Sequence, residues 1–178
     1  MAKSFLYFAY GSNLLSQRIL INNPTAIRKS IAKLENYRLD FGFPFSPRWG
    51  GCPATIVPYE GEHVWGAVWE ISECNKADLD RQEGVEAGIY ISLQVEVETE
   101  KREKLTCRSY QLCSTLTGLE HGECLPKERL PSEIYLAVIL KGAEESQLPK
   151  SYIEKLQNIP HNGSKGGDDV PIKFPLNI

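Results

Sequence analysis

The sequence lacks most of the features that identify a membrane, secreted or nucleic-acid-binding protein. Among its 178 residues the longest apolar run, residues 134–140, is far too short to cross a bilayer. Residues 1–4 lead directly into a predicted strand and do not resemble an export signal. The 20 basic and 23 acidic residues are scattered and give a net charge of −3, so no basic face favours nucleic acid. We therefore expect neither a membrane nor a nucleic acid among the partners.

Paired cysteine motifs are also missing, because none of the five cysteines belongs to a Cys-x-x-Cys sequence. An odd number of cysteines without an export signal is typical of reduced thiols in a cytoplasmic protein. Cys113, His121 and Cys124 lie near one another in the sequence, but their spacing fits no common zinc-ligand pattern and no fourth ligand is evident. The sequence thus predicts a cytoplasmic protein without a metal site.

The motifs of common catalytic sites are absent as well. There is no Gly-x-Ser-x-Gly elbow, no glycine-rich phosphate loop and no His-Glu-x-x-His sequence. The three histidines, His63, His121 and His161, are far apart and belong to no motif. A catalytic residue must therefore be identified by its local context among the abundant carboxylates.

Most of the chain has the alternation of apolar and polar residues that is typical of β-strands. Strands are predicted over residues 27–42, 63–72, 89–100 and 104–112. Helices are predicted after the glycine at position 11, over 76–83 and over 149–158. Many strands with few helices indicate an α+β fold, built on a small closed barrel of antiparallel or mixed strands with a few peripheral helices.

The domain organisation is expected to be simple, with one domain over residues 1–160 and a tail over 161–178. The tail begins with a flexible stretch rich in glycine and polar residues. Its last residues, 170–178, alternate strictly and are predicted to form an extended edge segment. The domain itself contains a loop rich in proline and glycine, in which Phe43, Phe45 and Trp49 are apolar enough to fold over a neighbouring part of the molecule.

The stretch "LYFAYGSNLLSQRI", residues 6–19, begins as a buried strand and continues as an amphipathic helix. Between the two lie Gly11, Ser12 and Asn13, residue types that tolerate tight turns and the starts of helices. Such a turn directs several free backbone N–H groups to one spot, which suits a carboxylate or an oxyanion. The same turn is also an ordinary connection between a strand and a helix.

Glu83 differs from most other acidic residues in its setting. It lies at the predicted end of a short helix that Gly84 stops, immediately before a predicted strand. A sheltered carboxylate at the negative end of a helix has a raised pKa and is suited to proton transfer. An exposed glutamate at a frayed helix end is the alternative.

The two stretches "YGSNL", residues 10–14, and "LDRQEGVEAGIY", residues 79–90, resemble the signature sequences of the γ-glutamylcyclotransferase family. The segments "VWGAVWEI", "LTCRSY" and "LPKSYIEKLQ" occur in the same order and at similar spacing. The resemblance covers residues 4–159 and departs from the family in the loop 43–52, in residues 114–132 and in the tail.

The resemblance implies an enzyme that needs no cofactor. Such enzymes let the α-amine of a γ-glutamyl amino acid attack its own γ-amide carbonyl, which releases the amino acid and forms 5-oxoproline. Glu83 matches the acid and base of the family, and the N–H groups of Gly11, Ser12, Asn13 and Leu14 match its binding loop. The tyrosines that match the family's binding cavity are Tyr10, Tyr90, Tyr110 and Tyr135. Each of the last three is equally compatible with core packing.

Other functions stay open. The same barrel suits a non-catalytic module that binds a γ-glutamyl metabolite. Within the family, glutathione-specific relatives resemble "YGSLIW" and γ-glutamylamine relatives resemble "YGTL" where this chain has "YGSNL". Asn13 is the discriminating residue, and its side chain is expected to cap the following helix or to bind the substrate. The expected partner is a small γ-glutamyl substrate, bound by a monomer or a homodimer.

Overall fold

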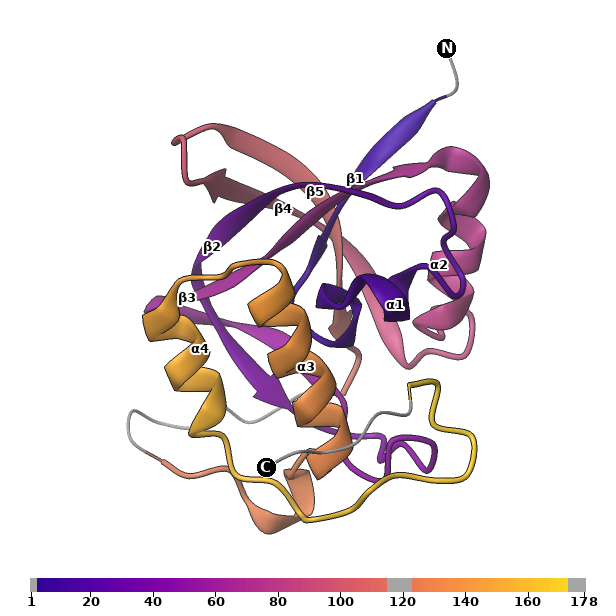
Figure 1. The fold of residues 1–178 in the computed structure, drawn as a ribbon, viewed down its shortest axis with the longest axis vertical. Coiled ribbons are helices and arrows are strands. Elements are labelled where there is room, and N and C mark those ends of the chain that lie inside the picture. Colours follow the sequence, from indigo (N-terminus) through magenta and orange to yellow (C-terminus); the bar gives the residue numbers. More distant parts are fainter. Residues whose placement is uncertain (1–2, 115–122, 173–178) are drawn as a thin grey trace.

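Five strands close into a barrel in the computed structural model, which describes residues 3–114 and 123–172 (Figure 1). The strands are β1 (Ser4–Ala9), β2 (Ile27–Phe41), β3 (Ala54–Ser72), β4 (Tyr90–Thr99) and β5 (Lys104–Leu112). Their order around the barrel is β1-β3-β2-β4-β5. The neighbours are antiparallel except β1 and β5, which run parallel and pair at Tyr7 and Arg108. The predicted small barrel of mixed strands is confirmed.

The longest strand, β3, begins well before the predicted residue 63. Its first half pairs with the end of β2, from Tyr37 opposite Pro58 to Phe41 opposite Ala54. A register shift between Glu35 and Tyr37 separates this half from the regular ladder. Proline and glycine in residues 54–62 weaken the sequence signal of a strand, whereas pairing with β2 supplies the hydrogen bonds that hold it.

The α-helices are α1 (Ser16–Ile19), α2 (Lys76–Gln82), α3 (Glu133–Glu145) and α4 (Lys150–Gln157). Short 3₁₀ helices lie at η1 (Ser12–Leu14), η2 (Glu73–Asn75) and η3 (Lys127–Arg129). The three predicted helices correspond to α1, α2 and α4, although α1 is a single turn. None of the helices in the described residues is long and apolar enough to span a membrane.

Helix α3 was not predicted from the sequence. Its apolar run, residues 134–140, is buried on almost every side, so no amphipathic period marks it as a helix. The Ser132 side chain caps its start by accepting a hydrogen bond from the Tyr135 N–H at 3.1 Å. Near its end, Gly142 lies so close to η1 that an added Cβ would be 2.5 Å from the Leu15 nitrogen. Helix α3 therefore packs directly against the loop that begins at Gly11.

Of the three aromatic residues in the loop between β2 and β3 that were expected to fold over a neighbouring part of the molecule, one does so. Trp49 is buried, and its ring centroid lies 4.9 Å from that of Tyr135. Phe43 and Phe45 remain 45% and 50% exposed, so the prediction is wrong for these two residues. Of the three aromatic residues, Trp49 is therefore the one that links this loop to α3.

The tail runs beside the same loop after residue 160. The Asn162 N–H donates to the Pro131 carbonyl at 3.0 Å, and the Gly167 N–H donates to the Arg48 carbonyl at 2.9 Å. Val170 and Ile172 are buried, yet residues 170–172 form no strand. The rest of the predicted edge segment, residues 173–178, lies outside the described residues, and the division of the chain at residue 160 stays a prediction.

Candidate active site

A cavity lies where the ends of β1 and α2 meet the loop at Gly11. The predicted residues that line it are Tyr10, Gly11, Ser12, Asn13, Glu83, Tyr90, Tyr110 and Tyr135. Tyr7 and Ala54 also line it, and Leu14 does not. Residues up to 128 positions apart in the sequence, Tyr7 and Tyr135, thus share one cavity.

Glu83 is placed at this cavity by the end of α2. It is the C-cap residue of the helix, and its N–H donates to the Leu79 carbonyl at 3.0 Å. Gly84 follows with a φ of 65°, in the left-handed region that glycine adopts without strain. A Cβ at Gly84 would also lie 2.9 Å from Cδ1 of Ile89. The predicted stop of the helix at Gly84 is therefore present, and it directs the Glu83 side chain into the cavity.

The environment of Glu83 suits proton exchange near neutral pH. Burial raises the pKa of Glu83 to about 7, because the ionised carboxylate loses contact with water. The positive charge of Arg18 acts in the opposite direction, the negative charge of Asp80 raises the pKa, and a hydrogen bond from Asn13 lowers it. A carboxyl group with this pKa can accept a proton and return it under physiological conditions.

Asn13 connects the binding loop to Glu83. Its Nδ2 donates to Oε1 of Glu83 at 3.3 Å and to the hydroxyl of Tyr7 at 3.0 Å. Its Oδ1 accepts a hydrogen bond from Nε2 of Gln82 at 3.1 Å, and Oε1 of Gln82 accepts one from Asn22 at 3.2 Å. This chain of amides fixes the orientation of Asn13 so that its NH₂ group faces the carboxylate.

The two expected roles of Asn13 therefore have different outcomes. Helix α1 has no side-chain cap, and its N-cap residue is Leu15, so the expectation that Asn13 caps the helix is wrong. A contact between Asn13 and the substrate stays a prediction. The observed role is to hold Glu83.

The backbone of the loop offers three N–H groups. No residue in the described ranges accepts a hydrogen bond from the N–H of Gly11, Ser12 or Asn13. The Leu14 N–H instead donates to the Gly11 carbonyl at 3.0 Å, and the Leu14 side chain is fully buried. The 3₁₀ turn thus uses the Leu14 N–H internally, and a contact of this group with the substrate stays a prediction.

Tyrosines form the walls of the cavity. The Tyr10 hydroxyl donates to the Tyr110 carbonyl at 2.6 Å, and the Tyr90 hydroxyl donates to the Ala54 carbonyl at 2.5 Å. The Tyr135 hydroxyl accepts a hydrogen bond from the Ala54 N–H at 3.1 Å. Burial raises the pKa of Tyr135 to about 12 and also raises the pKa values of Tyr10 and Tyr90 well above their ordinary value, so these walls are neutral.

Tyr110 is held from outside the cavity. Its hydroxyl donates to Oδ1 of Asp80, and Nε of Arg108 donates to that hydroxyl at 2.9 Å. Nη2 of Arg108 also donates to Oδ1 of Asp80 at 2.6 Å. The ion pair of Asp80 and Arg108 thus fixes the position of the Tyr110 ring.

Similar proteins share both the sequence and the barrel. The model of the AIG2-like family matches residues 63–156. The γ-glutamylcyclotransferase of Bos taurus is 44% identical over 167 residues, covering 92% of this chain and 83% of the relative, and that of Homo sapiens is 42% identical over the same lengths. A solved γ-glutamyl cyclotransferase structure superposes with a TM-score of 0.82 at 41% identity and covers 93% of each chain.

The chain belongs to the γ-glutamylcyclotransferase family. The predicted resemblance to this family is thereby confirmed. The matched range 63–156 of the family model contains Glu83, Tyr90, Tyr110 and Tyr135, whereas the loop at residues 10–14 precedes it.

Three neighbours of the γ-glutamylcyclotransferase site were missed by the sequence analysis. Tyr7 lies in β1, whose burial does not alternate, so no period marked it as facing inward. Gln82 carries no signal except that it precedes Glu83. Arg18 had one overlooked signal, because it falls at helical spacing with Leu14 and Leu15, which places a charged residue on an apolar face.

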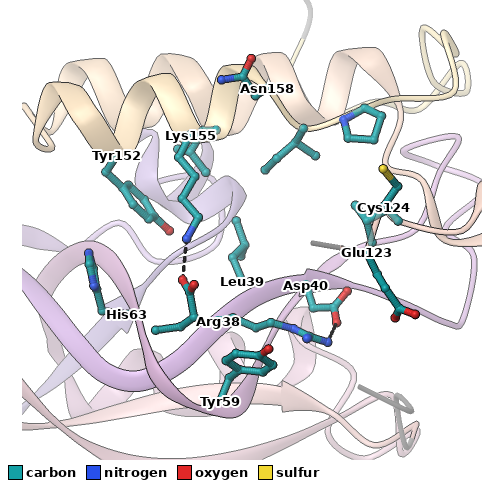
Figure 2. Close-up of a pocket in the computed structure, with 15 residues that line it drawn as sticks. Arg38, Leu39, Asp40, Tyr59, His63, Glu123, Cys124, Tyr152, Lys155 and Asn158 are labelled. Carbon is teal, nitrogen blue, oxygen red and sulfur yellow. Dashed lines mark hydrogen bonds and ion pairs between the residues drawn. The ribbon is translucent and has the colours of Figure 1, made fainter. Parts of the chain in front are cut away.

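A larger cavity of about 370 Å³ lies elsewhere, between α4 and the strands β2 and β3 (Figure 2). In it Lys155 pairs with Glu62 at 2.7 Å, while Asp40 pairs with Arg38 at 2.7 Å and also with Arg129. Its buried carboxylate, Asp40, is thus held between two guanidinium groups and is not placed for proton transfer. The cavity at Glu83 is therefore the candidate active site of this γ-glutamylcyclotransferase family member.

A metal centre has no support in the described parts of the chain, residues 3–114 and 123–172. No group of three or more His, Cys, Asp or Glu residues there is arranged to hold an ion. Cys113 and Cys124 are exposed free thiols, and His121 lies outside the described residues.

Proposed function

We propose that this protein is a γ-glutamylcyclotransferase, which converts a γ-glutamyl amino acid into 5-oxoproline and the free amino acid. The observation that carries the proposal is the position of Glu83: its carboxyl group, with a pKa raised by burial to about 7, lies in one cavity with the loop of unpaired N–H groups. A barrel alone does not imply activity, whereas an acid tuned to neutral pH beside an anion-binding loop does.

The reaction requires bond exchange within one molecule. The α-nitrogen of the γ-glutamyl group forms a bond to the γ-carbonyl carbon and closes a five-membered ring. The amide bond to the released amino acid breaks, so no water is consumed. Because both reacting groups are in one molecule, folding the substrate supplies a large proximity advantage.

Glu83 is the group that moves the proton. It takes one proton from the α-ammonium before attack and gives it to the nitrogen of the leaving amino acid. The attacking nitrogen loses its second proton once the new bond has formed, and that proton ends on the released amine, which leaves as an ammonium group. Glu83 therefore ends the reaction unchanged. Asn13 holds the carboxylate at 3.3 Å during both transfers. The N–H groups of Gly11, Ser12 and Asn13 stabilise the oxyanion that develops on the γ-carbonyl.

The first experiment is incubation of the protein with γ-glutamyl-alanine, followed by detection of 5-oxoproline and alanine by mass spectrometry. Wild-type protein is expected to release both in equal amounts. Glu83→Gln keeps the shape of the side chain but removes the base, so kcat is expected to fall about 10²- to 10⁴-fold.

Glu86→Gln is the matched control, because Glu86 is exposed and lies three residues after Glu83. This variant is expected to keep wild-type turnover. Equal turnover by folded Glu83→Gln and wild type would remove Glu83 from the mechanism. Absence of 5-oxoproline from wild type would instead favour a binding module.

The preferred substrates are small γ-glutamyl dipeptides, in preference to glutathione or γ-glutamylamines. This proposal rests on the sequence "YGSNL" at residues 10–14 and on the contact of Asn13 with Glu83, which ties that sequence to the reacting group.

Location and assembly complete the proposal. All five cysteines have free thiols, which is typical of a reducing compartment, and we place the protein in the cytoplasm. The homodimer rests on the family resemblance alone, and light scattering after size-exclusion chromatography tests it.

A further inference from the structure

Arg18 is a buried cation with no visible partner. Its residue is 5% exposed, and Nε has no hydrogen bond. Within the described residues its guanidinium group makes no ion pair shorter than 4.0 Å and donates no hydrogen bond. Buried polar groups are normally paired, and an arginine that stays charged is costly to bury alone. Among the described residues this arginine therefore lacks a partner, and a bound anion would supply one.

Arg18 is not itself one of the residues that line the cavity at Glu83, but the groups with which its charge interacts are. It lies on α1, directly after the loop that carries the three free N–H groups. Its charge interacts electrostatically with Glu83, Tyr7 and Tyr135, which all line the cavity. Yet Glu83 and Arg18 form no ion pair within 4.0 Å, and the side-chain hydrogen bond that Oε1 of Glu83 accepts comes from Asn13.

The γ-glutamyl substrate carries one charged group, its α-carboxylate, to which the proposed mechanism assigns no binding residue. A γ-glutamyl group has an α-ammonium, which reacts with Glu83, and a γ-carbonyl, which faces the loop N–H groups. It also has an α-carboxylate on the carbon that bears the ammonium. Arginine binds carboxylates in a planar, bidentate geometry, and such charge-assisted hydrogen bonds are among the strongest in proteins.

We propose that Arg18 binds the α-carboxylate of the γ-glutamyl group and thereby determines that this enzyme requires an α-carboxylate in its substrate. The proposal rests on the proposed cyclotransferase function. Holding the carboxylate at Arg18 turns the α-amine toward Glu83 and the γ-carbonyl. Arg18 is thus a substrate-binding residue that positions the nucleophile.

The test compares two substrates that differ only in this carboxylate. γ-Glutamyl-alanine carries it, whereas 4-aminobutanoyl-alanine has the same amine and amide without it and cyclises to 2-pyrrolidinone. Wild-type protein is expected to show a kcat/KM about 10- to 100-fold higher for γ-glutamyl-alanine. Equal values for wild type would overturn the proposal.

Arg18→Met keeps an apolar side chain of similar length and removes the charge. Measured at pH 9, above the pKa of Glu83, so that loss of the Arg18 charge has little effect on ionisation of that carboxyl group, it is expected to lower kcat/KM for γ-glutamyl-alanine about 10- to 100-fold, mainly through KM, and to lower that for 4-aminobutanoyl-alanine much less. Arg18→Lys is expected to recover part of the loss. Arg81→Met is the control, because Arg81 is also near Glu83 in sequence but its side chain is 74% exposed; both activities should stay at the wild-type level.

Product binding gives a second measurement for the case in which the analogue is turned over too slowly. The inhibition constant of 5-oxoproline, which carries the carboxylate, should rise about 10- to 100-fold in Arg18→Met, while that of 2-pyrrolidinone should not change. Circular dichroism of each variant verifies the fold.

Each outcome bears on one proposal. Equal losses for both substrates in Arg18→Met, together with a shifted pH profile, would assign Arg18 to tuning Glu83 and overturn its role as carboxylate receptor. An unchanged inhibition constant for 5-oxoproline would overturn it as well. Failure of wild type to cyclise either substrate would refute the cyclotransferase function itself.

Discussion

At the scale of single residues, burial changes the acid–base behaviour of Glu83. An ordinary glutamate is ionised at neutral pH and has little tendency to hold a proton. Enclosure in the cavity raises the pKa of Glu83 to about 7, although Arg18 and Asn13 both favour the ionised form. Loss of solvation is therefore the dominant effect, and the two polar neighbours limit it.

The pKa of Glu83 predicts the pH dependence of the reaction. Proton removal from the α-ammonium requires the ionised carboxylate, which predominates above its pKa of about 7. Below that value kcat/KM is expected to fall about tenfold per pH unit. A series of initial rates with γ-glutamyl-alanine from pH 5 to 9 measures this limb, and an acid limb centred near 4.5 would contradict it.

The same pKa predicts a stability difference. Below pH 4.5 Glu83 is protonated in both states; between 4.5 and 7 the folded protein holds the proton that the unfolded chain releases, so stability declines as the pH rises through 7. Glu83→Gln removes this decline. The unfolding free energy of the variant minus that of wild type should therefore increase by on the order of 1–3 kcal/mol from pH 4.5 to pH 8. Urea unfolding at both pH values measures it.

Gly11 has limited room for a side chain. An added Cβ would lie 3.5 Å from the Ala54 Cβ and from the Tyr135 hydroxyl, which is ordinary contact. Gly11→Ala is therefore expected to keep most activity. The methyl groups of Gly11→Val must push into these two neighbours, so KM should rise at least tenfold with the fold intact. Michaelis constants of the two variants test this, and a wild-type KM in Gly11→Val would contradict the role of the loop.

At the scale of elements, the site forms where η1, α1, α2 and α3 meet at the barrel. Arg28 on β2 donates to the Leu14 carbonyl at 3.0 Å and pairs with Glu145 at the end of α3. The Glu145 carboxylate also accepts a hydrogen bond from the Ser16 N–H at 3.0 Å. Arg28 on β2 and Glu145 on α3 thus hold the segment from Leu14 to Ser16, shortly after Gly11, in place.

A substitution at Gly142 tests the packing of this segment against α3. In an isolated helix Gly→Ala would stabilise by about 1 kcal/mol. Here the new Cβ would be 2.5 Å from the Leu15 nitrogen, so Gly142→Ala is expected to destabilise by about 1–3 kcal/mol and to lower turnover by displacing the loop. Thermal unfolding and 5-oxoproline assays measure both effects. Glu144→Ala, at an exposed position of the same helix, is the control, and a stabilised Gly142→Ala would contradict the close packing.

At the scale of the whole molecule, closure of the barrel forms a small cavity beside Glu83, and most of its walls are tyrosine side chains. Among γ-glutamyl dipeptides, glutathione and γ-glutamyl-ε-lysine, the dipeptides are expected to react at least tenfold faster. Equal concentrations of γ-glutamyl-alanine and the two competitors, incubated with one enzyme sample, allow 5-oxoproline to be counted against each leaving amine. Faster release of cysteinylglycine or lysine than of alanine would reverse this preference without changing the chemistry.

The local sequence was sufficient for features that depend on neighbouring residues. Alternation predicted β4 and β5, whose ladder runs from Tyr90 opposite Leu112 to Glu98 opposite Lys104. The glycine after Glu83 predicted the end of α2, because a left-handed backbone is a local property. The family resemblance added the roles of Glu83 and of the loop at residues 10–14, which periodicity alone does not supply.

Only the tertiary structure decided what the site contains. Helix α3 is buried on nearly every side, so its sequence carries no period, and its Tyr135 reaches the cavity through packing against η1. Asn13 and Glu83 are 70 positions apart and come into contact because the barrel closes. The raised pKa of Glu83 and the unpaired charge of Arg18 exist only in that enclosure, since burial is a property of the assembled fold and not of any single segment.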